Sequence, residues 1–254
     1  MLSLWRTPAD KARALLSLEH PERYASHMVG VRERARSELT AQIKRTARRH
    51  LARDGAAGQS LRAVARDLGM VSSAVYRYFP SRDDLLTALI IDAYDAFGAA
   101  AERAEAAIAR DDLLGRWRAA GTAAYTWSGK HAAEYALLFG SPVPGYRAPD
   151  DTIGPAGRFT GVLLGILADA ASAGQRPPEL SPLGDATRAD IDQLRSRIAV
   201  DIDADWLAAG LRAWTALIGL ISFIRFGHLH NVVLDEDAYF ADTLDRLGRS
   251  VIAE

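Results

Sequence analysis

The stretch LRAVARDLGMVSSAVYRYFPSRDDLL occupies residues 61–86 and decides the fold of the first part of the chain. Its spacing predicts a helix-turn-helix unit, in which two short helices cross closely around a tight turn. Ala65 is small enough for the second helix to cross over it, and Gly69 can adopt the positive φ of the turn. Val75, six residues after the glycine, is expected to face back toward the first helix. Three further apolar residues are expected to complete a small core: Val64, Leu68 and Val71.

The second helix of this unit is expected over residues 72–79, with Ser72 as its N-cap. A helix this short is marginal alone in water, because nucleation is costly, so packing against its neighbours must hold it. Pro80 ends it, and Ser81 opens a long helix with Asp84 as its capping-box partner. Consecutive residues cannot share a helical face, so the outward side chains point in several directions. These are Ser72, Ser73, Ala74, Tyr76, Arg77 and Tyr78.

The formal net charge of −1 hides a strong asymmetry along the chain. Residues 31–82 carry twelve basic and four acidic side chains, whereas residues 83–254 carry fifteen basic and twenty-five acidic ones. A basic block beside an acidic remainder is typical of a polyanion-binding module joined to another unit. The alternative interpretation of the charge alone is a solvated basic face.

Composition and missing motifs exclude several classes of protein. The 254 residues include no cysteine, so disulfides and thiolate metal sites are excluded. The N-terminal residues do not resemble a signal peptide, and the longest uncharged apolar run, 213–224, is too short to span a membrane. A soluble, cytoplasmic protein is expected. His228 and His230 have no carboxylate cluster nearby, and phosphate-loop and hydrolase motifs are absent, so we expect no metal, no cofactor and no enzyme.

Helical periodicity dominates the chain, and strand-like alternation is nearly absent, so the fold class is all-α. Three regions are expected: an N-terminal extension (1–30), a three-helix DNA-binding domain (31–80) and a helical bundle (81–254), to which the family resemblance given below assigns ligand binding and dimerisation. Residues 174–203 read as a long insertion with a short helix at 186–199. The other helices are expected at 8–19, 32–53, 61–68, 72–79, 81–109, 112–130, 132–140, 153–173, 204–229 and 236–252.

The region from about 31 to 90 resembles the DNA-binding domain of the tetracycline-repressor (TetR) family of bacterial transcription regulators. The resemblance rests on Ala65, Gly69, Tyr76, Tyr78, Phe79, Ser81, Arg82 and Leu85. The C-terminal half resembles more weakly the family's Trp-His-Gly subgroup. There Trp214, Gly219 and the stretch RFGHLHNVV match, but Ile218 stands where that subgroup usually has a histidine.

This resemblance implies a set of DNA contacts. Arg77 is expected to contact guanine, whereas Tyr76 and Arg82 are expected to contact phosphates. Tyr78 either touches DNA or packs under the recognition helix. Arg45 and Arg48 add electrostatic attraction, although simple solvation is the other interpretation of Arg48. The predicted DNA-binding residues are Ser60, Arg62, Ser72, Ser73, Ala74, Tyr76, Arg77, Tyr78, Arg82 and Lys44.

The aromatic residues of the C-terminal half read either as bundle core or as the wall of an apolar ligand pocket. The resemblance favours a pocket lined by Tyr125, Tyr135, Phe139, Phe159 and Trp214. Arg158 is either a charged anchor of this pocket or a surface arginine. The segment 213–224 is apolar on nearly all sides, so more than one face must be buried. We expect the helices at 204–229 and 236–252 to form a homodimer interface, the alternative being burial within one subunit.

The sequence therefore predicts a homodimeric DNA-binding transcription regulator. In this interpretation it is a repressor that binds a palindromic operator and is released by a small apolar ligand, which tilts the helix at 81–109. The alternatives are a helical enzyme or small-molecule carrier with an incidental helix-turn-helix, and an activator or a regulator that needs a protein partner.

Overall fold

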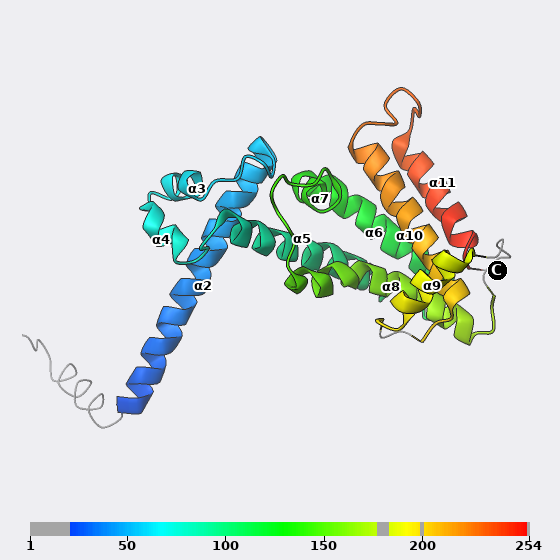
Figure 1. Ribbon diagram of the computed structural model, residues 1–254, viewed down its shortest axis with the longest axis horizontal. Coiled ribbons are helices and arrows are strands. Elements are labelled where there is room, and N and C mark those ends of the chain that lie inside the picture. Colours follow the sequence, from blue (N-terminus) through cyan, green and yellow to red (C-terminus); the bar gives the residue numbers. More distant parts are fainter. Residues whose placement is uncertain (1–20, 177–182, 199–200, 253–254) are drawn as a thin grey trace, which may run out of the picture.

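The computed structural model describes residues 21–176, 183–198 and 201–252, with side chains from Glu33 onward. This part of the chain is helical and contains no strand, which confirms the predicted all-α class (Figure 1). The expected helix at 8–19 lies outside the described residues. The helices are α2 (Pro21–Asp54), α3 (Leu61–Asp67), α4 (Ser72–Tyr76), α5 (Arg82–Glu105), α6 (Leu113–Lys130), α7 (Ala132–Phe139), the 3-10 turn η1 (Asp150–Thr152), α8 (Ile153–Ser172), α9 (Asp185–Arg195), α10 (Ala204–Arg225) and α11 (Glu236–Arg249).

The first three of these helices form a small head with its own core. Val75 of α4 is fully buried against α3, and Ala65 lies at the close crossing of these two helices. Gly69 makes the turn between them with φ of +64°. Packing thus holds a helix of five residues that could not form alone. The head core consists of Ile43, Ala47, Leu61, Val64, Ala65, Val75 and Phe79, together with Leu85 and Leu89 of α5.

Serines cap the helices on both sides of α4, as predicted for Ser81, but the start of α4 differs from the prediction. Ser60 Oγ accepts a hydrogen bond from the amide of Ala63, and Ser81 Oγ accepts one from the amide of Asp84. Ser72, however, is the first residue inside α4, and the N-cap is Val71. Val71 is extended, with φ of −69° and ψ of 140°, so its side chain turns outward and is 71% exposed. Its predicted place in the core is therefore wrong.

Helix α2 begins at Pro21, eleven residues before the predicted start, and crosses the boundary expected between residues 30 and 31 without a break. Proline is compatible with the first turn of a helix, because its missing amide would have no partner there. Gly30 lies inside the helix, where it costs about 1 kcal/mol relative to alanine but does not end it. Figure 1 shows the first half of α2 running past the rest of the head.

The remaining helices form a bundle around a second core, which includes Phe97, Trp117, Phe159, Ile166 and Leu217. Helix α5 runs from the head into this bundle, where it packs chiefly against α6 and α8. It ends at Glu105 and α10 ends at Arg225, each about one turn earlier than predicted.

By length and hydropathy, α10 is the one helix in the described part of the chain that could cross a membrane. Nine of its residues are nevertheless buried inside the bundle. This burial, together with packing against α8, α9 and α11, marks α10 as a core helix of a helical bundle.

The contact between α5 and α8 is close enough to exclude a methyl group at Gly98. A Cβ there would lie 2.5 Å from Cβ of Arg158, which belongs to the stiff base of that side chain. We expect Gly98→Ala to lower the free energy of unfolding by about 1–3 kcal/mol, because the two helices must separate. Gly161→Ala is the matched control in α8, since its Cβ meets nothing within 4 Å. It should be neutral or stabilising by up to about 1 kcal/mol. Urea denaturation of both variants tests this, and equal effects would contradict the close packing.

Candidate nucleic-acid interface and ligand pocket

The outer edge of the head, which we call the reading edge, is built from α4 and the turn before it. Val71, Ser73, Tyr76 and Arg77 are exposed there. Ser72 and Ala74 are half-buried, as is Ser60 at the start of α3, whereas Arg62 is exposed. The fold therefore brings most of the predicted DNA-contacting residues to one end of the molecule (Figure 1).

Tyr78 lies beneath this edge and forms a platform for a residue that the sequence analysis missed. Its ring packs against the head core and is half-buried. The guanidinium of Arg36, on α2, stands over the ring at 5.6 Å from its centroid, within the range of a cation–π contact. The available signal in the sequence was the seven-residue spacing between Arg36 and Ile43, which places both on one face of α2.

Three of the predicted cationic contacts are already bonded within the protein. Lys44 and Arg48 of α2 both form ion pairs with Asp92 of α5, Lys44 at 2.8 Å. Arg82 donates to the backbone oxygens of Ala56 at 2.9 Å and Ala57 at 3.3 Å. These bonds orient the head on α5. Contact of the same three side chains with DNA phosphates stays a prediction.

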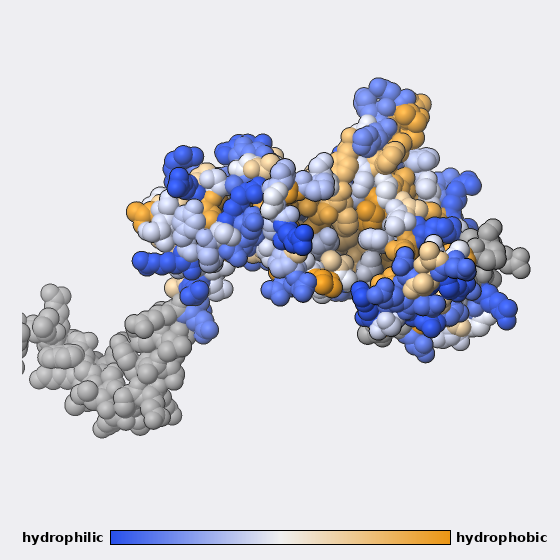
Figure 2. Space-filling view, in the orientation of Figure 1, coloured by the Kyte–Doolittle hydropathy of each residue, from blue (hydrophilic) through white to orange (hydrophobic). Residues whose placement is uncertain are grey.

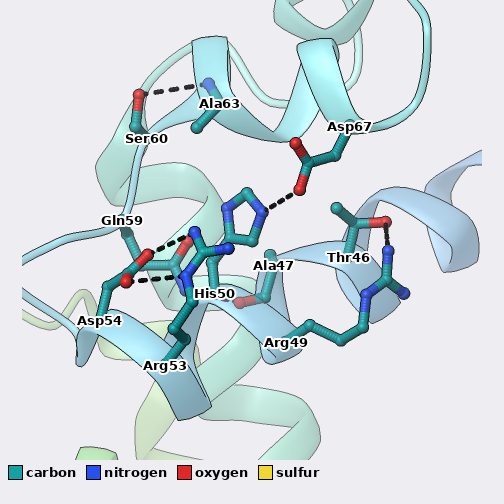
Figure 3. Close-up of polar contacts among 10 residues, drawn as sticks. All are labelled: Thr46, Ala47, Arg49, His50, Arg53, Asp54, Gln59, Ser60, Ala63 and Asp67. Carbon is teal, nitrogen blue, oxygen red and sulfur yellow. Dashed lines mark hydrogen bonds and ion pairs between the residues drawn. The ribbon is translucent and has the colours of Figure 1, made fainter.

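A polar cluster around the buried His50 joins α2 to α3 (Figure 3). His50 is 2% exposed, and its Nε2 lies 2.6 Å from Oδ2 of Asp67 at the end of α3. Gln59 donates to the carbonyl oxygen of Ala47 at 2.6 Å and ties the connecting loop to α2. The hydrogen bond with His50 lowers the pKa of Asp67 below its ordinary value. The cluster therefore fixes the angle between α2 and the helix-turn-helix.

An apolar cavity of about 310 Å³ lies between α5, α7, α8 and α10. Three of the six residues predicted for the pocket line it, namely Phe139, Phe159 and Trp214. Sequence reasoning missed Tyr94 and Phe97, which α5 contributes. The rest of the lining comes from α8: Pro155, Ala156, Gly157 and Thr160.

Tyr135 lies behind this wall and does not line the cavity. Its ring centroid is 5.0 Å from that of Phe139, and its hydroxyl lies 2.9 Å from Oγ of Ser222. Burial raises the pKa of Tyr135 to about 12, so the phenol is neutral at physiological pH. Tyr135 therefore supports the aromatic wall from inside the bundle core.

Tyr125 and Arg158, the other two predicted pocket residues, point elsewhere. Tyr125 stacks on Phe240 of α11 at 4.0 Å and donates to Asp237 at 2.6 Å. Arg158 pairs with Glu102 and with Asp95, both on α5. Its charge is therefore compensated along the α5–α8 contact, and no sequence pattern indicates this choice of partners.

The fold and the exposed edge define the class of this protein. It is a helical DNA-binding transcription regulator with a helix-turn-helix head on a larger helical bundle. Two family models match the chain: bacterial regulatory proteins of the tetR family over residues 43–89, and the tetracyclin repressor-like C-terminal domain over residues 117–247.

Named relatives show the same similarity. The HTH-type transcriptional regulators Rv1816 of Mycobacterium tuberculosis and Mb1846 of Mycobacterium bovis are each 37% identical over 229 residues, covering 89% of this chain and 97% of theirs. The crystal structure of the regulatory protein SCO4313 is 32% identical, with a TM-score of 0.71 over 85% of this chain and 97% of that one. A tetR-family regulatory protein from Rhodococcus RHA1, 20% identical with a TM-score of 0.56 over 85% and 97% of the two chains, shares the fold.

The chain therefore belongs to the tetR family of transcription regulators, which are DNA-binding proteins and not enzymes. The predicted family and fold are confirmed. The weaker resemblance to the Trp-His-Gly subgroup stays a prediction, because the matching C-terminal model is described as tetracyclin repressor-like and does not name that subgroup.

The bond between His50 and Asp67 predicts a pH-dependent contribution to the stability of the head. A carboxyl group whose pKa is lowered by folding stabilises the folded state above its unfolded pKa, about 3.9, and loses this effect as the pH falls. We expect Asp67→Asn to lower the urea midpoint equally at pH 6 and pH 5, and the difference from wild type to shrink only as the pH falls below about 4. In a His50→Gln background the same substitution should show no such pH dependence. A difference that is constant with pH would contradict the assignment.

Proposed function

We propose that this regulator is a homodimeric repressor that binds a palindromic operator and is released by a small apolar ligand. The observation that carries the proposal is the path of α5. Leu85 and Leu89 at its start belong to the head core, and Tyr94 and Phe97, two turns further on, line the apolar cavity. A ligand that changes the position of α5 at the cavity also changes the position of the head.

The surface of α10 supports a dimer. Leu211, Phe223 and Phe226 are exposed apolar residues on or just after this helix, and Phe223 is 55% exposed. Figure 2 shows hydrophobic surface gathered around α10 and the loop that leads to α11. Covering such a surface by a second copy of the chain would place two heads side by side. Two-fold symmetry then calls for two half-sites about 34–36 Å apart, one turn of the DNA helix.

The chemistry of the cavity supports an apolar ligand. Its lining is mainly aromatic, and the hydroxyl of Thr160 already donates to the carbonyl oxygen of Gly157 at 2.9 Å. A compact aromatic or aliphatic molecule fits this wall better than a charged one, because Arg158 is paired outside it. In the proposed switch the ligand favours a state in which α5 tilts and the spacing of the two heads no longer fits the operator. Such a regulator acts in the cytoplasm, where the DNA lies.

Substitutions of Tyr76 and Arg77, the two exposed side chains at the end of the reading edge, should change DNA binding in different ways. We expect Arg77→Ala to lose about 1–3 kcal/mol of discrimination at one base pair, because a bidentate contact to guanine is removed. Tyr76→Phe should weaken binding to all sequences by a similar factor, since a phosphate contact carries no sequence information. The measurement is gel-shift titration on a duplex that the wild-type protein has selected from a random-sequence library, and on its single-base variants. The opposite pattern would show that the two roles are exchanged.

The same titration separates the proposed function from the alternatives. Duplex binding that weakens steeply with salt is expected of a DNA-binding protein. A full-length protein that binds no duplex at low salt would favour a helical carrier with an incidental helix-turn-helix. A protein that binds its selected duplex but raises transcription from it would be an activator.

Filling the cavity should uncouple the ligand from DNA binding. Gly157 lines the cavity, and a Cβ built there meets nothing within 4 Å. We expect Gly157→Leu to bind the operator with wild-type affinity but to resist release by a compound that releases the wild-type protein, because leucine occupies the ligand's volume. Gly161→Leu, one turn along α8 and outside the cavity lining, is the control and should respond normally. Normal release of Gly157→Leu would exclude this cavity as the ligand site.

A further inference from the structure

Val71 occupies the outer tip of the head, in the turn between α3 and α4. It is 71% exposed, and Figure 2 shows a hydrophobic spot at this tip. The described part of the head has two exposed large hydrophobic side chains, those of Val71 and Tyr76. Of these two, Val71 is the aliphatic one. Its neighbours on the reading edge, Ser73, Tyr76 and Arg77, all carry polar groups.

Valine is unfavourable at this position on two counts. Its methyl groups stay in water, and its side chain cannot accept the hydrogen bond that an N-cap residue normally accepts. The helices on either side, α3 and α5, both begin after serines whose side chains accept such a bond. A serine at residue 71 would satisfy both local rules. Where a sequence breaks local rules without a structural gain, a binding function is the first explanation to test.

The partner is given by the chemistry of the DNA major groove. Base edges there present hydrogen-bond donors and acceptors, and the one protruding apolar group is the 5-methyl group of thymine. We propose that Val71 reads a thymine methyl group in each half-site and thereby sets the base preference at that position. This inference rests on the proposed binding of an operator and adds to it a specificity-determining residue.

Atomic substitution in the DNA tests the inference directly. The probe is the duplex that the wild-type protein selects from a random-sequence library, in which each thymine is replaced in turn by uracil, so that only the methyl group is lost. We expect one uracil in one half-site to weaken wild-type binding about four-fold, the size expected for one buried methyl group, and the symmetry-related pair of uracils to weaken it about fifteen-fold. Val71→Ala, which changes both subunits, should bind the thymine duplex about as weakly as wild type binds the duplex with both uracils. For this variant the same replacement should have no further effect. Val71→Thr keeps one methyl group and should remain sensitive to it.

A second variant distinguishes a role of Val71 in DNA recognition from a role in the stability of the fold. Val71→Ser supplies the missing cap, so we expect its melting temperature to rise by about 2–4 °C while its affinity for the selected duplex falls several-fold. Opposite shifts of stability and affinity cannot come from a purely structural role.

Two results would overturn the inference. In one, no thymine replacement in the half-site affects wild-type binding. In the other, the same replacements weaken Val71→Ala and wild type equally. Both leave the proposed function intact, because the wild-type protein still selects and binds a duplex. A wild-type protein that selects no sequence would instead defeat the proposed function and this inference with it.

Discussion

The rest of the structure depends on α5, a single helix buried in two cores. Its first two turns place Leu85 and Leu89 in the core of the head, and Phe97 lies in the core of the bundle. An α-helix cannot bend sharply without proline, a bulge or an inserted group, and α5 has no proline. A change in the orientation of the head therefore requires a movement of α5 within the bundle. In the proposed switch, this constraint is what would let a ligand beside Phe97 act on a DNA contact far from it.

Ion pairs along α5 hold both parts of the protein to it. Near the head, Asp92 binds Lys44 and Arg48 of α2. Further along, Asp95 and Glu102 bind Arg158 of α8. At the end of the helix, Glu105 binds Arg116, which is 2% exposed and also pairs with Asp169 of α8. These pairs contribute less to stability than the two cores do, because desolvation offsets much of their attraction. They do specify which face of α5 meets each neighbour.

Most features predicted correctly from the sequence are set by neighbours along the chain. The cap at Ser81, the glycine turn at residue 69 and the buried Val75 each depend on residues within one or two turns. The cap predicted at Ser72 is wrong although it is local, and the other features missed depend on partners far away in the sequence. Arg158 looked like a pocket anchor, but carboxylates some sixty residues earlier are its partners. Tyr125 looked like a pocket wall, but Phe240 of α11 stacks on it. Periodicity shows that a side chain is buried or exposed, and it does not identify the residue across the contact.

The basic block of the sequence also overstates the charge that is free to meet DNA. Lys44, Arg48 and Arg53 form ion pairs within the head and with α5, and Arg82 binds backbone oxygens. Within the described residues, the side chains of four exposed arginines of the basic block form no hydrogen bond, ion pair or cation–π contact: Arg45 of α2, Arg62 and Arg66 of α3, and Arg77 directly after α4. Most of this free charge thus lies on the helix-turn-helix itself, where short-range contacts form. A head of this kind gains less from long-range attraction than its composition suggests, so its affinity must depend more on the fit of the reading edge. In the proposed function this places the weight of recognition on α4, which its own Val75 anchors in the head core against α3, while α2 holds α3 in turn.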